Sequence, residues 1–241
     1  MGMKVKEWGP EAWKFLHTLS FMNKNFDGKS WTNFIKAMSS VLPCIYCRSS
    51  AKQYMKIFPP EFSSAYDVQT WLYQLHGFVN LKLEQKGEAI KEEPSWAELK
   101  EEYSNVIKSK LNWEPQMWNF LFTLSENCPK KCNHAVKCKF DRFWKSFAEL
   151  HPESELVKKY LSNNPFSDGI FDRDKLKWTH DMANYIHNRN GSSYTCDPLY
   201  FVHQKCKNSR VGKEDFKIHD CKVQPELVKN ILSENTVSFM F

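Results

Sequence analysis

The chain has 241 residues, of which 41% are hydrophobic and 15% aromatic, and its formal net charge is +6. A chain of this length can bury one large core or two small ones. It shows no apolar run that could span a membrane, no signal-peptide pattern at its start and no cluster of lysines, so we expect no membrane segment and no nucleic-acid binding.

Apolar residues recur at helical spacing along the chain, and no segment alternates convincingly as a strand would. We therefore predict an all-α fold. In chain order, helices are expected over residues 10–22, 30–42, 44–57, 67–86, 95–110, 115–125, 140–150, 153–162 and 173–189.

The second of these helices leads into the only Cys-x-x-Cys motif of the chain, Cys44 with Cys47. Such a motif can be half of a zinc site, a thioredoxin-type redox pair or a structural bridge. Zinc would require a second ligand pair at similar spacing, and thioredoxin a preceding strand, whereas residues 31–42 have a helical pattern. Since Pro43 suits the start of a helix, we expect both thiols in a first turn, where the exposed N–H groups stabilise a thiolate.

Aromatic and imidazole side chains flank this motif on two other helices. Trp13 and His17 are four residues apart and share a face, and His76, Asn80 and Leu83 share another. A flavin ring needs flat apolar walls and a few polar groups aimed at its heteroatoms, which these side chains could supply. The alternative is that the histidines are only partly buried and satisfied by backbone carbonyls.

Taken together, three motifs resemble the Erv/ALR family of FAD-linked sulfhydryl oxidases over roughly residues 5–110: Trp-x4-Trp-x3-His from Trp8, Pro-Cys-x-x-Cys from Pro43, and His-x-x-Val-Asn-x-x-Leu from His76. The resemblance implies a four-helix bundle with a short fifth helix that binds FAD. It also implies a thiol oxidase that makes disulfides in substrate proteins and passes the electrons to O2, giving H2O2.

The same resemblance assigns roles to individual residues. The substrate thiolate would attack Cys44, and Cys47 would lie beside the flavin. The FAD site would be formed by Gly9, Trp13, His17, Tyr54, Trp71, His76, Val79, Asn80, Lys82, Leu83, Lys86 and Trp96. The two lysines are four residues apart and could meet a pyrophosphate, although such lysines often form only a solvated face. No metal site is expected.

The chain departs from the family pattern at three places. Gly77 stands where the family usually has Asn, and Tyr73 stands where it usually has a cysteine. The disulfide that holds the short fifth helix should therefore be absent. The spacing from Leu83 to Lys86 is one residue longer than usual, which leaves open whether Lys82 or Lys86 reaches FAD.

An internal repeat follows. Residues 113–125 match residues 8–20 at eight of thirteen positions with an offset of 105. Residues 143–147 resemble the second helix, and residues 174–187 resemble the segment from residue 68 to residue 80. We predict two helical domains, residues 1–111 and 112–241, that pack directly against each other. The second would stand in for the second subunit of a family dimer, and a homodimer of whole chains stays possible.

The second copy lacks the residues that carry the chemistry. Phe122 replaces His17, and Ala183 replaces His76. When Pro152 is aligned with Pro43, Glu153 and Leu156 take the positions of the two redox cysteines. The second domain should therefore be a degenerate copy that neither binds flavin nor transfers electrons.

Six further cysteines lie in the second half. We place Cys128, Cys132 and Cys138 in an insertion between its first two helices, and Cys196, Cys206 and Cys221 in a tail. Six cysteines allow fifteen disulfide connectivities. They could staple the insertion to the tail, Cys128 with Cys132 could be a shuttle disulfide, or His134 could complete a zinc site with the three of the insertion.

Eight cysteines would be unusual in a chain without a signal peptide if all stayed free thiols, and a disulfide-generating enzyme would account for them. The Lys-, Asn- and Phe-rich composition suits a large cytoplasmic DNA virus, so we expect the protein in the host cytoplasm, in the viral factory, or in the virion. Its partners would be thiol-containing proteins and O2. The competing hypothesis is a non-enzymatic, all-helical interaction protein stabilised by disulfides or zinc.

Overall fold

The structure is a computed structural model that describes residues 5–22, 25–88, 93–126, 134–166 and 175–189. Within these ranges every regular element is a helix, which confirms the all-α prediction. The helices are α1 (Val5–Met22), α2 (Gly28–Val41), α3 (Ile45–Ile57), α4 (Ala65–Glu84), α5 (Trp96–Val106), α6 (Lys110–Glu126), α7 (His134–Leu150), α8 (Ser154–Asn163) and α9 (Lys175–Arg189).

Two helices begin one turn earlier than predicted, and for the same reason. α1 and α6 each contain a proline, Pro10 and Pro115, which suggested a helix start because proline lacks the N–H that an interior position needs. In both helices the turn before the proline carries a tryptophan, Trp8 or Trp113, that is buried in the core. The burial of a large aromatic side chain offsets the backbone hydrogen bond that the proline removes.

Side-chain caps fix the starts of the other helices of the first half. Asp27 accepts hydrogen bonds from the backbone N–H groups of Lys29 and Ser30 at the start of α2. Reciprocal capping boxes begin α4, from Ser64 with Asp67, and α5, from Ser95 with Glu98.

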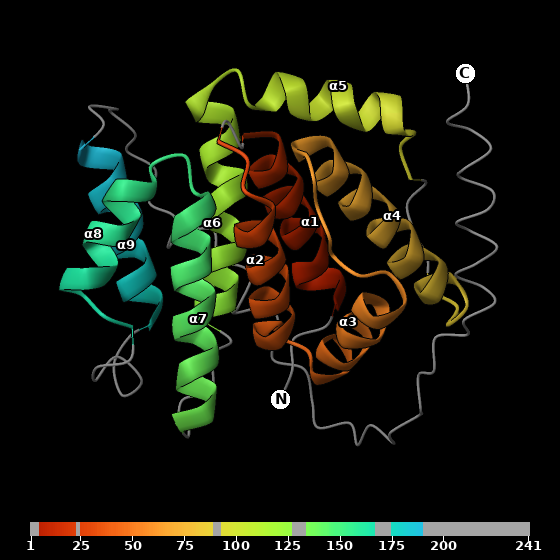
Figure 1. Ribbon diagram of the computed structural model, residues 1–241, viewed down its shortest axis with the longest axis horizontal. Coiled ribbons are helices and arrows are strands. Elements are labelled where there is room, and N and C mark those ends of the chain that lie inside the picture. Colours follow the sequence, from red (N-terminus) through yellow and green to blue (C-terminus); the bar gives the residue numbers. More distant parts are fainter. Residues whose placement is uncertain (1–4, 23–24, 89–92, 127–133, 167–174, 190–241) are drawn as a thin grey trace.

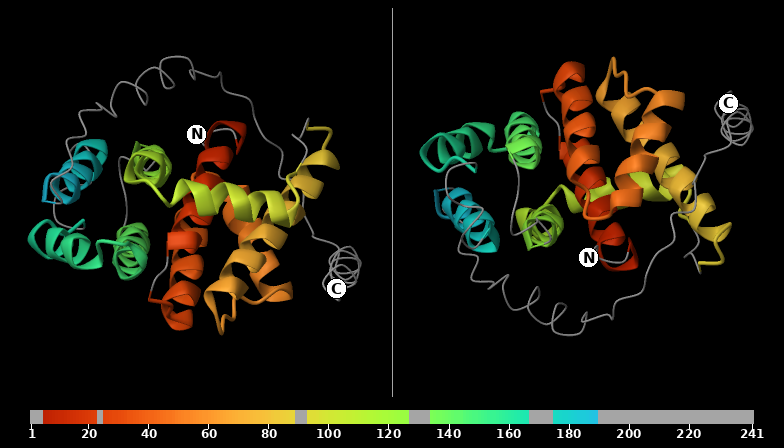
Figure 2. Two further views of the ribbon diagram at one scale, coloured as in Figure 1. Left: turned by 90° about the horizontal axis from the view of Figure 1, so that it is seen from above. Right: turned by 90° about the horizontal axis from the view of Figure 1, so that it is seen from below.

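Helices α1 to α4 form a bundle, and α5 crosses one of its ends (Figure 1). Helix α6 packs along α1 and α7 packs along α2, while α8 and α9 cover the outer side of α6 and α7 (Figure 2). Buried apolar residues of both halves belong to one core. None of the helices in the described ranges is long and apolar enough to cross a membrane.

Residues that occupy equivalent positions in the two halves touch each other across the interface. The ring centroids of Phe15 and Phe120, related by the offset of 105, lie 5.3 Å apart. Those of Phe34 and Phe143, which are equivalent in the alignment of Pro43 with Pro152, lie 5.9 Å apart. A residue that contacts its own counterpart lies near an axis of approximate two-fold symmetry.

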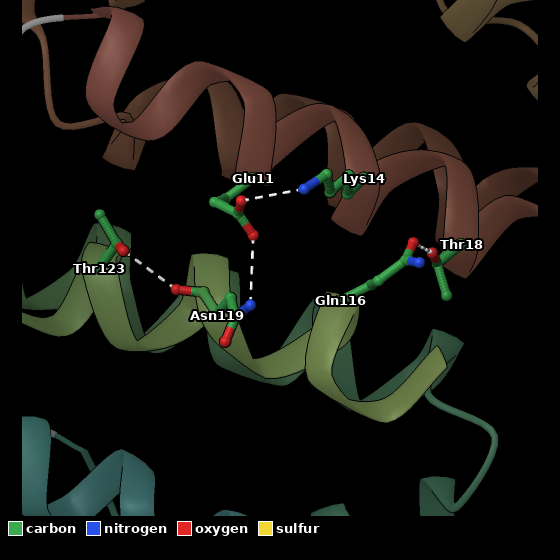
Figure 3. A network of polar contacts seen from close by, with 6 residues as sticks. All are labelled: Glu11, Lys14, Thr18, Gln116, Asn119 and Thr123. Carbon is green, nitrogen blue, oxygen red and sulfur yellow. Dashed lines mark hydrogen bonds and ion pairs between the residues drawn. The ribbon is translucent and has the colours of Figure 1, made fainter. Parts of the chain in front are cut away.

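Polar contacts border this apolar interface along α1 and α6 (Figure 3). The Thr18 hydroxyl donates a hydrogen bond to Gln116 Oε1 at 3.0 Å. The Asn119 amide donates to Glu11 Oε2 at 3.3 Å, and Glu11 also accepts from Lys14.

A second equivalence concerns the joints between α3 and α4 and between α8 and α9. The Trp71 indole N–H donates to the carbonyl of Phe58, which caps the end of α3. The Trp178 indole N–H donates in the same way to the carbonyl of Asn164, which caps the end of α8.

The insertion is shorter than we predicted. Helix α7 begins at His134, so Cys138 lies on the helix and not in a loop; it is an exposed free thiol whose sulfur lies 3.4 Å from His134 Nε2. The early start follows from residues 134–139, which are compatible with a helix although they add little apolar surface to its buried face. Among the described residues no three potential ligands come together as a metal site. Cys128, Cys132, Cys196, Cys206 and Cys221 lie outside the described residues.

Candidate functional site

The redox pair lies at the start of α3, and the structure corrects the position of its first sulfur. Helix α3 begins at Ile45, two residues after Pro43, so Cys44 is the N-cap and only Cys47 lies in the first turn. The residue before a helix adopts extended backbone angles, which lets the Cys44 sulfur turn back and accept a hydrogen bond from the Cys47 N–H at 3.2 Å. Both thiols are free and half-buried.

This geometry makes the two thiols unequal. The Cys47 thiol, donating to the Cys44 sulfur, lowers the pKa of Cys44 to about 6, and the backbone N–H groups of Cys47 and Tyr46 add to the effect. The same sulfur contact, together with burial, raises the pKa of Cys47. The reduced pair therefore carries one thiolate near neutral pH, held on Cys44 by the N-terminus of the helix.

Cys47 is the sulfur that faces α4. Lys82 of that helix and Lys86, which lies just after its end, act electrostatically on Cys47 and favour its thiolate, whereas Cys44 is influenced by Arg48 of its own helix. Lys82 also donates a hydrogen bond to the buried Ser50 hydroxyl of α3. The sequence left open whether Lys82 or Lys86 reaches FAD. In the structure both lysines act on the Cys47 sulfur.

Tyr54 belongs to the same joint between α3 and α4. Its ring is 5% exposed, packs against Phe78 with 6.3 Å between ring centroids, and lies 5.8 Å from the Lys82 ammonium. An aromatic face so close to an ammonium fixes the direction of the lysine side chain.

A cluster of flat rings connects α1 to α4. Trp13 stacks on His76 with 4.2 Å between ring centroids, and His17 lies 5.9 Å from His76. The Tyr103 ring of α5 lies 5.2 Å from His17 and closes the far side of the cluster. Sequence reasoning missed Tyr103, because nothing in the helical pattern of α5 separates it from an ordinary core position.

The two histidines are buried without hydrogen-bond partners. Both ring nitrogens of His17, which is 1% exposed, and Nδ1 of His76 are buried and unpaired. Burial lowers the pKa of His17 to about 3 and that of His76 to about 4, so both rings are neutral at physiological pH. The alternative that backbone carbonyls satisfy these histidines is wrong for His17.

Unpaired buried polar atoms are costly, so their presence beside stacked rings indicates a ligand with both flat and polar surfaces. FAD fits this description, because it carries two planar ring systems with hydrogen-bonding heteroatoms. The residues present on α1, α3 and α4 thus suit the cofactor that the sequence predicted.

The other predicted FAD residues have varied surroundings. Gly9 is buried in α1; Val79, Asn80 and Leu83 are half-buried on α4. Trp96 begins α5 and contacts Tyr73 with 5.5 Å between ring centroids. Trp71 is 4% exposed, stacks on Phe58, and has its indole N–H bonded to a carbonyl, which gives it a clear packing role. The assignment of these six residues to FAD stays a prediction.

Comparison with known proteins agrees with this site. The model of the Erv1/Alr family matches residues 10–103, which include the aromatic and imidazole cluster and both cysteines. This part of the chain is similar to the Erv1/Alr family. FAD-linked sulfhydryl oxidases from three isolates of African swine fever virus are each 29% identical over 114 residues, which cover 44% of this chain and 87% of the viral relative. No solved structure matched the chain.

The departures from the Erv1/Alr pattern have structural counterparts. Tyr73, which replaces a cysteine, donates a hydrogen bond from its hydroxyl to the Pro94 carbonyl at 3.1 Å and packs against Trp96. It thereby holds the start of α5 to α4 without a disulfide. At Gly77 an added Cβ would lie 3.3 Å from Glu93 Oε2, so a larger residue would displace that carboxylate.

Proposed function

We propose that the protein is an FAD-dependent thiol oxidase that makes disulfide bonds in substrate proteins and passes the electrons to O2, giving H2O2. The observation that carries the proposal is the Cys44–Cys47 pair at the start of α3, next to a cluster of stacked rings whose buried nitrogens have no partner. The viral relatives, named FAD-linked sulfhydryl oxidases, support it.

The cysteines perform the exchange chemistry. When the pair is oxidised, a substrate thiolate attacks the Cys44 sulfur, forms a mixed disulfide and displaces Cys47 as a thiolate. A second thiolate of the substrate then attacks the substrate sulfur of this mixed disulfide. Cys44 is released as a thiolate, which the helix N-terminus stabilises. The substrate leaves with a disulfide, and the pair holds two electrons.

The residues around Cys47 prepare it to deliver those electrons. FAD, when bound, supplies the two-electron acceptor that a dithiol needs and the reactivity toward O2. Lys82 and Lys86 favour the thiolate of Cys47, the sulfur on the α4 side. Neutral His17 and His76 can offer hydrogen-bonding nitrogens without placing a positive charge in the buried cluster.

The first test is the spectrum and the oxygen consumption of the purified protein. We expect flavin absorbance near 450 nm and consumption of O2 with dithiothreitol. Cys47→Ser should still bind FAD, but dithiothreitol should no longer bleach the flavin, because one sulfur cannot form the disulfide that releases two electrons. Cys138→Ser, which changes the exposed thiol on α7, is the matched control and should behave as wild type. Normal turnover of Cys47→Ser, or a colourless protein that ignores added FAD, would overturn the proposal.

We further propose that residues 112–241 form a degenerate Erv-like domain that binds no flavin and replaces a second subunit. In this half Phe122, at the position of His17, stacks on Trp118 with 6.1 Å between ring centroids. Glu114, at the position of Gly9, is 5% exposed and lies 3.0 Å from the Nδ1 atom of buried His187. These side chains fill space that glycine and a cofactor would leave open.

The stoichiometry of flavin per chain tests this second proposal. We expect one FAD per chain when protein concentration and released flavin are measured together. Two FAD per chain would contradict the degeneracy of the second half.

We also propose that the protein acts in the host cytoplasm, in the viral factory, or in the virion, which the viral origin of its relatives supports.

A further inference from the structure

Glu93 is a carboxylate beside the cofactor site to which no role has been given. It lies just before α5 and faces α4, where its Oε2 atom is 3.3 Å from the position that a Cβ of Gly77 would take. The Asn80 side chain lies beside it and favours the charged form, whereas burial raises the pKa of the carboxyl group.

The carboxylate has an unused hydrogen-bonding atom. Glu93 Oε1 is buried and has no hydrogen-bond partner. An ionised carboxylate only accepts hydrogen bonds, so the missing partner must be a donor. Burying a carboxylate oxygen without a donor is costly, which indicates that a ligand supplies one.

The side of α4 that Glu93 faces indicates which part of FAD it meets. On a helix, residues three or four apart share a face. Lys82 lies on the flank of α4 that faces Cys47, with Lys86 following the end of the helix, whereas Gly77, Asn80 and Glu84 lie on the flank that faces Glu93. His76 and Leu83, two of the residues predicted to bind FAD, lie between these two flanks of α4.

A flavin ring that reaches Cys47 would lie toward the first flank, so the remainder of the cofactor would extend toward the second. The donors of its nucleotide half are the adenine amino group and the two adjacent hydroxyls of a ribose. Two carboxylate oxygens match two adjacent hydroxyls, a pairing that dinucleotide-binding proteins also use for ribose.

We propose that Glu93 binds the ribose hydroxyls of the adenosine half of FAD and thereby makes the site selective for FAD over FMN. The proposal rests on the proposed function. Gly77 is then the residue that gives the carboxylate its place, and the Tyr73 hydroxyl, bonded to the carbonyl of Pro94, fixes the neighbouring backbone.

The test measures the affinity of flavin-depleted full-length protein for FAD and for FMN by quenching of flavin fluorescence at pH 8. Glu93→Ala should weaken FAD binding by about 10- to 100-fold, the effect expected for hydrogen bonds to a charged group, and leave FMN binding unchanged. Glu93→Gln, which keeps the shape and one acceptor, should weaken FAD binding less. Gly77→Ala, which displaces the carboxylate, should also act on FAD alone.

Glu84→Ala is the matched control, because it removes an exposed carboxylate from the same flank of α4. It should change neither affinity. Equal losses for FAD and FMN in Glu93→Ala and Glu93→Gln, an unchanged FAD affinity, or an equal loss in Glu84→Ala would overturn the assignment. If the wild-type protein bound neither flavin, the proposed function itself would fail, whereas wild-type FAD binding with unaffected Glu93 variants would overturn this inference alone.

Discussion

At the scale of residues, His17 shows how a cofactor site strains the protein around it. Its ring is buried between Trp13, His76 and Tyr103, and neither nitrogen has a partner. In the second half the equivalent residue is Phe122, which needs no partner and stacks on Trp118. The same helix position thus carries either a costly polar ring that a ligand can satisfy or an apolar ring that stabilises the core.

The buried histidines make the stability of the flavin-free protein depend on pH. Burial lowers the pKa of His17 to about 3 and that of His76 to about 4, from the ordinary value of 6.5. His151, whose pKa burial lowers to about 3, behaves the same way. Between about pH 6.5 and 4 these histidines bind protons in the unfolded chain but stay neutral in the folded chain. Their contribution to the free energy of unfolding is therefore complete above pH 6.5 and is lost as the pH falls.

We predict that His17→Phe, which introduces the residue found at the equivalent position Phe122, reduces the loss of stability at acid pH. Each such histidine contributes up to about 1.4 kcal/mol per pH unit in this window. Urea unfolding of the flavin-free protein at pH 4.5, 5.5 and 6.5 should therefore show a shallower dependence of the free energy of unfolding on pH for the variant. An identical slope for variant and wild type would show that His17 is not buried as a neutral ring.

At the scale of elements, a helix that crosses the bundle end needs an anchor. α5 is 11 residues long, too short to be stable alone, and it meets α4 through Tyr73 and Trp96 at its start. The hydrogen bond from the Tyr73 hydroxyl to the Pro94 carbonyl joins α4 to the start of α5 where the resemblance had led us to expect a disulfide. A single hydrogen bond constrains the unfolded chain far less than a disulfide, so this anchor should be weaker.

Tyr73→Phe isolates that hydrogen bond, because it keeps the ring and its contact with Trp96. We expect a loss of about 0.5 to 1.5 kcal/mol in the free energy of unfolding, measured by urea denaturation of the FAD-bound protein. Tyr66→Phe is the control, since Tyr66 also contacts Trp96 but is 48% exposed. A loss as large in Tyr66→Phe would mean that the Tyr73 hydroxyl is not the anchor.

For the whole molecule, the main feature is that one apolar core joins the two halves of the chain. Phe15 against Phe120 and Phe34 against Phe143 place side chains at equivalent sequence positions in contact, and the core runs through both pairs. Because both halves belong to one chain, this association does not depend on protein concentration.

Phe120→Ala tests whether the halves fold as one unit. Phe120 and Phe15 are both fully buried, so either truncation should cost about 3 to 5 kcal/mol. If the core is shared, Phe120→Ala in the second half should lower the temperature at which the first half releases flavin by as much as Phe15→Ala does. Thermal unfolding followed by flavin fluorescence and by far-ultraviolet circular dichroism should give coincident transitions. Separate transitions, with flavin release unaffected by Phe120→Ala, would show two independent cores.

Local sequence patterns were enough to predict the helical class, the approximate positions of the helices within the described residues, the Cys44–Cys47 pair and the repeat. These features depend on local causes: the spacing of apolar residues, a unique Cys-x-x-Cys motif and a matching of letters at fixed offset. The errors were local too, since the helix starts before Pro10 and Pro115 depend on where Trp8 and Trp113 are buried.

How those elements meet depends on packing between distant segments. That packing places Cys44 as a cap, turns Cys47 toward Lys82 of α4, brings Tyr103 against His17 and sets Glu93 over Gly77. Each of these contacts joins segments whose separation along the chain has no fixed relation to their separation in space. Burial and unpaired polar atoms, which indicate the cofactor site, are properties of that packing and have no counterpart in a linear pattern.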